Sequence, residues 1–234
     1  MSESACSSDR RRWPAPATWA LVLGYLAVAL LCLRRWGAPA PWSRLDAASA
    51  LALLASVVLA VQQVAFGRAL PQTAEVQREA FGMSYDPAMA RAISLLAAVE
   101  LLVFVEYAHE PLAQALDAGA LRWSGVVLYA ATVAWLAWVD AALVGHFNEA
   151  ASGRRLLTTG PYRYVRHPRY VGLIASRVAF ALVFASVVAW VLIAGWVWIV
   201  RRRVVREEAH LTVVFGPAYG EYAQRTWRLV PGLY

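Results

Sequence analysis

The sequence lacks lysine altogether and carries little charge of either sign. Charged residues make up 16% of its 234 positions, whereas 60% are hydrophobic. A typical soluble domain has about 25% charged residues. One soluble core does not need this excess of apolar side chains, so a membrane protein is the first interpretation. The 11 Trp and 10 Tyr agree with it, since both types favour membrane–water interfaces.

Cysteine is also scarce, with only Cys6 and Cys32 in the chain. Their spacing suits neither a metal site nor a redox pair, and a disulfide framework is excluded. All 22 basic residues are arginine, and the net charge is +7. These arginines cluster at the ends of apolar segments, which is typical of topology signals and of contacts with anionic headgroups. We therefore expect membrane lipids as partners, no nucleic acid and no metal.

Four apolar segments precede residue 146. A helix needs about 20 apolar residues to span a bilayer. The candidate segments are roughly 17–33, 45–66, 92–107 and 123–145.

A fifth apolar stretch, 171–200, is longer than one span requires. Its 30 residues would extend about 45 Å as a single helix, beyond a hydrocarbon core of about 30 Å. Arginines flank both ends, and the positive-inside rule places both ends in the cytoplasm. This predicts a helical hairpin that turns near Ala185 and Ser186. No Gly or Pro marks the turn, which leaves a long tilted single helix as the alternative.

The predicted fold class is all-α, a polytopic membrane helix bundle of about four spanning helices plus a C-terminal helical hairpin. Residues 1–145 would hold the N-terminal transmembrane helices, and 146–234 a separate core. The positive-inside rule places the N-terminus, the 67–91 loop and the C-terminal region in the cytoplasm. Three arginines in the first outside loop argue against this orientation: Arg34, Arg35 and Arg44.

Most of the polar sequence lies in two blocks, 147–172 and 201–231, on either side of the predicted hairpin. The first contains L-x-T-x-G-x-Y and then R-H-P-x-Y-x-G. The second contains R-x-x-x-E-E-x-x-L and then F-G-x-x-Y-x-x-Y. A hairpin with both ends on one side would bring the two blocks together at the cytoplasmic boundary. Arg203 and Glu207 are four positions apart and are expected to share one face of an amphipathic helix.

This ordered set resembles the isoprenylcysteine carboxyl methyltransferase family, and bacterial membrane methyltransferases and phospholipid methyltransferases share much of it. The resemblance covers about residues 147–231, with none in 1–145 beyond apolar segments. The matching residues are Leu156, Thr158, Gly160, Tyr162, Arg166, His167, Pro168, Tyr170, Gly172, Arg203, Glu207, Glu208, Leu211, Phe215, Gly216, Tyr219 and Tyr222.

The resemblance implies S-adenosylmethionine as methyl donor, bound at the cytoplasmic edge of the membrane. It implies cofactor contacts by Arg154, Arg155, Leu156, Leu157, Tyr162, His167, Pro168, Tyr170 and Glu207. Many relatives have His in place of Arg154, so a backbone role is expected there. Arg203 matches the arginine assigned to the substrate and is the candidate catalytic residue.

The implied reaction is carboxyl O-methylation of an isoprenylcysteine-like or other small lipophilic acid by a multi-pass protein of the bacterial plasma membrane. The acceptor itself stays open among small lipophilic and lipidated compounds. A carboxylate acceptor needs no general base, whereas an amine or a thiol would make His167 or His210 a candidate base.

Two other classes of function remain as alternatives. Membrane reductases of the sterol and steroid type share an R-H-P-x-Y-x-G-like motif and use NADPH. They usually have Asn after the H-P pair and Glu after the Gly, where this chain has Arg169 and Leu173. A non-enzymatic membrane scaffold or transporter is the third class, and it would bind neither cofactor.

Charged residues inside the apolar segments are costly in lipid and should face the bundle. Glu100 and Arg177 are predicted to pair, and Asp140 has no assigned role. Cofactor binding is expected to tolerate Glu208→Gln better than Glu207→Gln, because neighbouring helical positions point about 100° apart.

Overall fold

The computed structural model describes residues 15–34, 36, 38, 42, 45–70, 87–109, 119–149 and 155–232. Within these residues the regular structure is helical, apart from one β-bridge between Val165 and Trp227. The elements are α1 (Ala15–Leu33), α2 (Ala47–Ala69), α4 (Pro87–His109), α6 (Gly119–Glu149), the 3-10 helix η3 (Gly160–Arg163), α7 (Pro168–Phe184), α8 (Val187–Phe215) and α9 (Pro217–Arg225).

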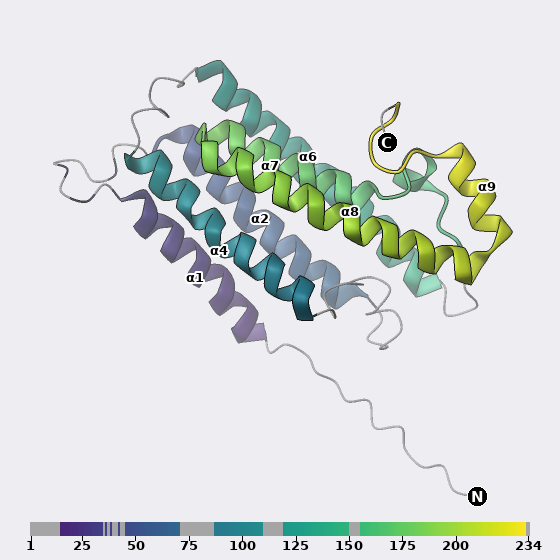
Figure 1. Ribbon diagram of the computed structural model, residues 1–234. Helices are drawn as coiled ribbons and strands as arrows, with labels where there is room; N and C mark the ends of the chain where they lie inside the picture. The colour runs from purple at the N-terminus through teal and green to yellow at the C-terminus, as the bar shows by residue number, and fades with distance from the viewer. Residues whose placement is uncertain are drawn as a thin grey trace, which may run out of the picture.

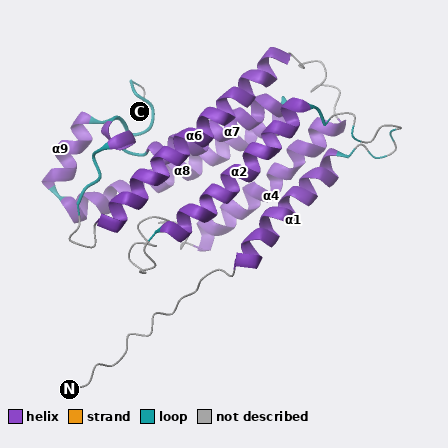
Figure 2. Cartoon of the chain, turned by 180° about the vertical axis from the view of Figure 1, so that it is seen from behind, coloured by secondary structure: helices purple, strands orange, loops and turns teal. Residues whose placement is uncertain are grey.

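The six long helices run side by side in one bundle, and α9 lies at one end of it (Figure 1). The view from behind places α9 and the C-terminal segment at the same end (Figure 2). Three segments are long and apolar enough to cross a bilayer: Ala47–Ala69, Arg91–His109 and Gly119–Asn148. A shorter apolar helix, Val22–Leu33, accompanies them. The predicted polytopic helical membrane fold is confirmed.

The predicted hairpin is confirmed as well, and its turn lies at the predicted residues. α7 ends at Phe184, Ala185 adopts a left-handed conformation with φ of 46°, and Ser186 caps α8. The Ser186 hydroxyl oxygen accepts a hydrogen bond from Ala189 N at 3.0 Å. A left-handed alanine costs about 1–2 kcal/mol, so the turn needs support from outside its own sequence.

Glu106 on α4 supplies that support. Its carboxylate accepts hydrogen bonds from Val187 N at 3.0 Å and Val188 N at 3.2 Å, and also from the Ser186 hydroxyl. A carboxylate at a helix N-terminus satisfies free N–H groups and complements the helix dipole. The signal for the turn is therefore a residue about 80 positions away, which explains why no Gly or Pro marks it.

Arg122 closes the same end of the bundle. Its guanidinium donates to both Asp46 carboxylate oxygens at 2.6 and 2.8 Å, to Val183 O at 2.8 Å and to the Tyr107 hydroxyl at 2.6 Å. One buried side chain thus joins the starts of α2 and α6 to the ends of α4 and α7.

Within the apolar layer, the predicted pair of Glu100 and Arg177 is present. Arg177 Nη1 lies 2.6 and 2.7 Å from the two Glu100 oxygens, and its guanidinium lies 4.7 Å from the centre of the Trp196 ring. Pairing and stacking offset much of the cost of placing these charges among apolar helices. The pair links α4, α7 and α8.

Close contact between α6 and α7 depends on Gly125. A Cβ atom at this position would lie 2.9 Å from Ala179 O, from Leu182 Cβ and from Val183 Cγ2. Only a residue without a side chain lets the two helices approach this closely.

We therefore predict that Gly125→Ala lowers stability by about 1–3 kcal/mol, because the new methyl group meets a backbone carbonyl that cannot move alone. The matched control is Gly145→Ala on the same helix, where a Cβ would meet nothing within 4 Å. That change should be neutral or stabilise by up to about 1 kcal/mol. The measurement is the midpoint of thermal unfolding of each purified variant in detergent. Equal midpoints for the two variants would contradict the close contact of Gly125 with α7.

Candidate functional site

The first polar block begins with a compact corner. Gly160 has a φ of +60°, which glycine adopts without strain, and Pro161 is the first-turn proline of η3. Pro168 occupies the same kind of position in α7, after His167 as N-cap. Both prolines suit helix starts because they have no N–H to leave unpaired. The chain thus passes from η3 into α7 within the four residues 164–167.

The C-terminal segment is joined to this corner by backbone hydrogen bonds. Arg166 N donates to Trp227 O at 2.7 Å, His167 N donates to Arg228 O at 3.1 Å, and Trp227 N donates to Tyr164 O at 3.2 Å. These bonds make the parallel bridge between Val165 and Trp227. Residues 226–228 therefore hold the corner in place, a role that sequence reasoning missed because neither segment shows an alternating strand pattern.

Glu208 lies at the centre of this junction. Its carboxylate accepts from Arg166 Nε at 2.9 Å and from Arg228 Nε at 2.7 Å. His167 Nε2 lies 3.4 Å away, and only 12% of the Glu208 side chain is exposed. Arg166 also donates to Ala223 O and Thr226 O, both at 2.5 Å.

Glu208 is therefore an anchor of the junction, which the offset of about 100° from Glu207 did not predict. That Glu208→Gln affects cofactor binding less than Glu207→Gln stays a prediction. The 100° offset between the two residues is real, but it points Glu208 toward the corner and the C-terminal segment. These two parts fold over the side of α8 that helical geometry alone would leave to solvent.

The environment keeps Glu208 ionised. Burial by itself would raise the pKa of this carboxyl, but the neighbouring His167 and Arg166 outweigh burial and lower the pKa to about 2. Two basic groups that stabilise the carboxylate account for the direction.

Glu207 lies one residue earlier and faces the start of α7. Its Oε2 accepts from the Tyr170 hydroxyl at 2.9 Å, and His167 Nδ1 lies 3.7 Å from the same oxygen. The Arg203 guanidinium lies 5.3 Å from the centre of the Tyr170 ring, and His167 stacks on that ring at 5.7 Å. The hairpin therefore brings together four of the residues predicted for the site: His167, Tyr170, Arg203 and Glu207.

Tyr162 and Pro168 border this group. Tyr162 O accepts from the Tyr222 hydroxyl at 2.8 Å, and Pro168 O accepts from Trp135 Nε1 at 2.8 Å. Burial, with the Glu207 charge as a second cause, raises the pKa of Tyr162 well above its usual value. Tyr162 is thus a neutral phenol within the electrostatic reach of Glu207.

The remaining predicted residues precede η3. Arg155 is exposed, and Leu156 and Leu157 are half-buried in a stretch without regular structure. Arg154 lies outside the described residues. A cofactor role of these four positions stays a prediction.

A second polar cluster supports the start of α7, and no sequence motif predicted it. Arg169 Nε donates to Asp140 Oδ1 at 3.0 Å, Arg169 also donates to the Gln63 side chain, and its guanidinium lies 4.4 Å from the Phe66 ring centre. Asp140 has 5% of its surface exposed. These contacts fix the residue between Pro168 and Tyr170 against α2 and α6, from partners up to 106 positions away.

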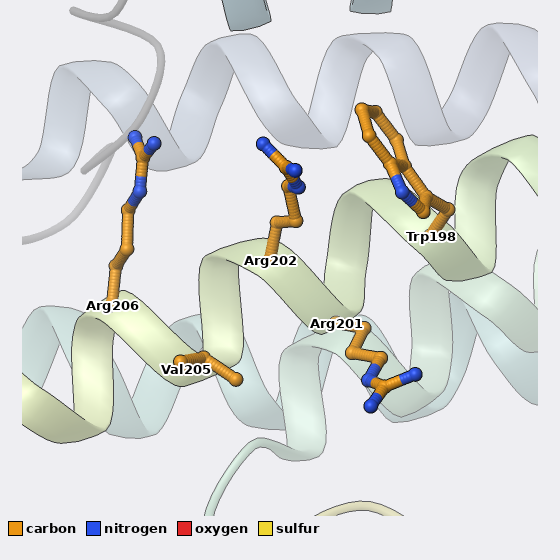
Figure 3. A pocket seen from close by; sticks show the side chains of 5 residues that line it. All are labelled: Trp198, Arg201, Arg202, Val205 and Arg206. Carbon is orange, nitrogen blue, oxygen red and sulfur yellow. The ribbon is translucent and has the colours of Figure 1, made fainter.

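A surface hollow of about 310 Å³ lies elsewhere on α8 and is lined by Trp198, Arg201, Arg202, Val205 and Arg206 (Figure 3). None of the predicted site residues lines it. No group of three or more metal-ligating side chains occurs among the described residues.

The helix bundle defines a polytopic membrane protein. Its candidate site residues His167, Tyr170, Arg203 and Glu207 lie together at one end of the bundle. Comparison with known families finds that the model of the phospholipid methyltransferase family matches residues 115–218.

Three curated relatives are named as protein-S-isoprenylcysteine O-methyltransferases. The Dictyostelium discoideum protein is 31% identical over 81 residues, which cover 34% of this chain and 34% of the relative. The Schizosaccharomyces pombe protein is 32% identical over 77 residues, covering 32% and 33%. The B form of Arabidopsis thaliana is 35% identical over 78 residues, covering 33% and 40%. The similarity thus spans between a third and two fifths of the length of these relatives. The predicted resemblance to the isoprenylcysteine carboxyl methyltransferase family is confirmed.

The family match begins earlier than the expected residue 147, and it includes α6. The packing gives a physical reason, since α6 contacts α7 along its length and carries Trp135 and Asp140, which hold the start of α7. The apolar pattern of 123–145 contains no motif from which this role could be read.

We predict that Glu208→Gln lowers stability by roughly 3 kcal/mol, because it leaves Arg166 and Arg228 half-buried without their anion. Glu221→Gln is the control, since the Glu221 carboxylate is 72% exposed and pairs only with a surface arginine. The measurement is thermal unfolding in detergent at neutral pH.

A comparison of the native protein with the Glu208→Gln variant at several pH values also tests the pKa of Glu208. A carboxyl whose folded pKa is lowered from 4.5 to about 2 stabilises the fold above its unfolded pKa and loses this contribution as the pH falls toward 2. The stability difference between the native protein and Glu208→Gln should therefore shrink below about pH 5. A stability difference that stays constant as the pH falls would contradict the lowered pKa of Glu208 and its contacts with Arg166 and His167.

Proposed function

We propose that the protein is an integral-membrane, S-adenosylmethionine-dependent methyltransferase that acts on a lipophilic acceptor. The single observation that carries the proposal is the hydrogen bond from the Tyr170 hydroxyl to Glu207. It joins the two sequence blocks that carry the family resemblance at one end of the bundle. The names of the relatives support the reaction class.

The chemistry of these residues fits the donor. S-adenosylmethionine is a cation with an ammonium group and a ribose diol, and both favour a carboxylate partner. Glu207 is 39% exposed, and among the described residues its Oε1 accepts no hydrogen bond. A carboxylate has about four acceptor sites, so capacity for a ligand remains. His167 is buried between the two carboxylates, with Nδ1 3.7 Å from Glu207 and Nε2 3.4 Å from Glu208.

When bound, S-adenosylmethionine supplies an electrophilic methyl group. Glu207 would hold it by charge, while Tyr162, Pro168 and Tyr170 would pack against its flat groups. The opposite edge of the cofactor pocket would be formed by backbone groups of Arg154, Arg155, Leu156 and Leu157.

Arg203 would orient the acceptor. Its guanidinium stacks on Tyr170, which keeps a planar cation beside Glu207. Such a fork binds a carboxylate with two hydrogen bonds. Because methyl transfer depends on alignment and on exclusion of water, this positioning is the main task left to the protein for an acceptor that is already ionised.

We infer that the acceptor is a carboxylic acid with a lipid tail, either isoprenylcysteine-like or another small lipophilic acid. An acceptor dissolved in the bilayer would approach from the side, between helices. The arginines at the site end of α8 favour an orientation with this end toward the cytoplasm, in the plasma membrane of a bacterium. We keep residues 146–234 as the proposed methyltransferase core, with α6 packed against it.

The first experiment is a calorimetric titration of the purified protein with S-adenosylmethionine and, separately, with NADPH. Saturable binding of S-adenosylmethionine alone is the expected result. Binding of NADPH instead would identify a reductase, and binding of neither would indicate a scaffold.

For the donor site, we predict that Glu207→Gln weakens S-adenosylmethionine binding at least about tenfold, since a lost charge-assisted hydrogen bond costs about 1.5–3 kcal/mol. Thermal unfolding of the variant should stay near that of the native protein because Glu207 is partly exposed. Glu221→Gln is the control of equal charge and should bind normally. Native affinity in folded Glu207→Gln would remove this residue from the site.

For the acceptor site, we predict that Arg203→Lys retains donor affinity but loses turnover, by roughly tenfold or more, because lysine keeps the charge but not the planar fork. Arg225→Lys, at an exposed arginine of α9, is the control. Single-turnover methylation of a lipophilic carboxylic acid and donor binding are measured on the same preparations. Equal rates for the two variants would show that Arg203 only anchors the helix.

A further inference from the structure

Helices α7 and α8 share two similar cation–π contacts. At the candidate site the Arg203 guanidinium lies 5.3 Å from the centre of the Tyr170 ring, and deeper in the bundle the Arg177 guanidinium lies 4.7 Å from the centre of the Trp196 ring. Arg177 follows Tyr170 by seven positions, and Trp196 precedes Arg203 by seven. Seven residues are about two helical turns, so each helix carries its two members on nearly the same face, about 10 Å apart.

The deeper contact lies midway along the hairpin. Arg177 is seven positions from Tyr170 and seven from Phe184, where α7 ends. Glu100, its partner on α4, is the central residue of the apolar span Arg91–His109. The guanidinium is therefore placed at a depth where hydrocarbon offers no hydrogen-bond acceptor, and its N–H groups need partners from the protein or from a ligand.

Arg177 uses only part of its hydrogen-bonding capacity. Both of its hydrogen bonds to Glu100 come from Nη1. Among the described residues Nε and Nη2 donate to no partner, and 29% of the side chain is exposed. Arg122 at the end of the bundle donates instead from all three of its nitrogens. The two unused nitrogens of Arg177 form one planar edge that can bind an oxygen atom.

The charges at this depth select the kind of ligand. Glu100 already neutralises Arg177, and a second anion would bring an uncompensated charge into the apolar bundle. A hydroxyl or carbonyl oxygen requires only donors. Nε1 of Trp196, the ring on which Arg177 stacks, is buried and also lacks a hydrogen-bond partner within the described part of the chain. The unused donors therefore suit a neutral oxygen.

Between the two contacts the hairpin is lined by apolar side chains. Leu173 and Ile174 of α7 pack against the small cluster of Tyr170, Val200 and Val204. A hydrocarbon chain whose carboxylate is held at the site end would follow these side chains for about two helical turns before it reaches the second contact.

We propose that the methyl acceptor carries a hydroxyl or carbonyl oxygen within its hydrocarbon chain, about 10 Å from the carboxylate that is methylated, and that Arg177 binds this oxygen. The inference rests on the proposed function, in which Arg203 orients the carboxylate. Arg177 is then a residue that determines acceptor specificity. Ester carbonyls of the surrounding lipids lie in the interfacial region of the bilayer and not at this depth.

The test compares three long-chain fatty acids of equal length: one without a further oxygen, one with a mid-chain hydroxyl and one with a terminal hydroxyl. Binding to the full chain in detergent is followed by native mass spectrometry and by thermal stabilisation. The mid-chain isomer should bind at least about tenfold more tightly than the terminal isomer, because it gains a hydrogen bond from a charged donor. The isomers have the same functional groups, so equal affinities would overturn the proposal.

The variant Arg177→Leu/Glu100→Leu removes both members of the ion pair, which leaves no buried charge without a partner. It should bind the two hydroxy acids equally. The matched control is Arg225→Leu/Glu221→Leu, which removes an exposed ion pair from α9 and should retain the preference. A preference that persists in the folded Arg177→Leu/Glu100→Leu variant would assign the oxygen to another place and overturn the proposal.

Arg177→Lys provides a second variant that keeps the ion pair with Glu100 if the leucine pair does not fold. Lysine has no second planar edge, so the preference for the mid-chain hydroxyl should fall at least about threefold, the worth of one hydrogen bond. An unchanged preference in this variant would also overturn the proposal.

Methyl transfer from S-adenosylmethionine to the same three acids separates this proposal from the proposed function. Methylation of the unsubstituted acid with no preference for the mid-chain hydroxyl would leave the proposed function intact and overturn the role of Arg177. A mid-chain preference in binding without methylation of any acid would support the oxygen site and contradict the proposed function.

Discussion

The ion pairs around Glu208 are the interaction on which the candidate site depends. Arg166 comes from the corner before α7, Arg228 from the C-terminal segment and Glu208 from α8. A small apolar cluster of Tyr170, Val200 and Val204, with Leu229 packed against it, lies beside these ion pairs. A shared carboxylate with little exposure ties the three parts to one another, and removal of one partner would leave the others with an uncompensated charge. The same junction decides where Glu207 lies, because Glu207 is the preceding residue of the same helix.

The same principle holds the bundle together. Buried charges in the described helices are neutralised by partners far away in sequence: Arg177 by Glu100, Arg169 by Asp140 and Arg122 by Asp46. Apolar helices in lipid gain little from packing apolar surfaces alone, so close contacts and polar pairs define their neighbours. Each pair joins two different helices. Together they fix the relative positions of α2, α4, α6 and α7, and through α7 they fix the start of the corner.

Helix α8 connects the bundle to the candidate site. Its first half packs Leu192 and Ile199 among the other helices, and its second half carries Arg203 and Glu207 toward Tyr170 at the start of α7. The position of these two side chains therefore depends on how the whole helix packs in the bundle.

The sequence by itself determined the class of the fold, the approximate helices and the hairpin, because length, hydropathy and the placement of arginines are local properties. It also determined the ordered motifs and the pairing of Glu100 with Arg177, since a charge in an apolar segment requires a partner. Only the tertiary structure decided the role of Glu208, the support of Arg169 by Asp140 and Gln63, and the capping of α8 by Glu106. Each of these depends on which helix faces lie against each other, and a contact between residues many positions apart leaves no periodic trace in either segment.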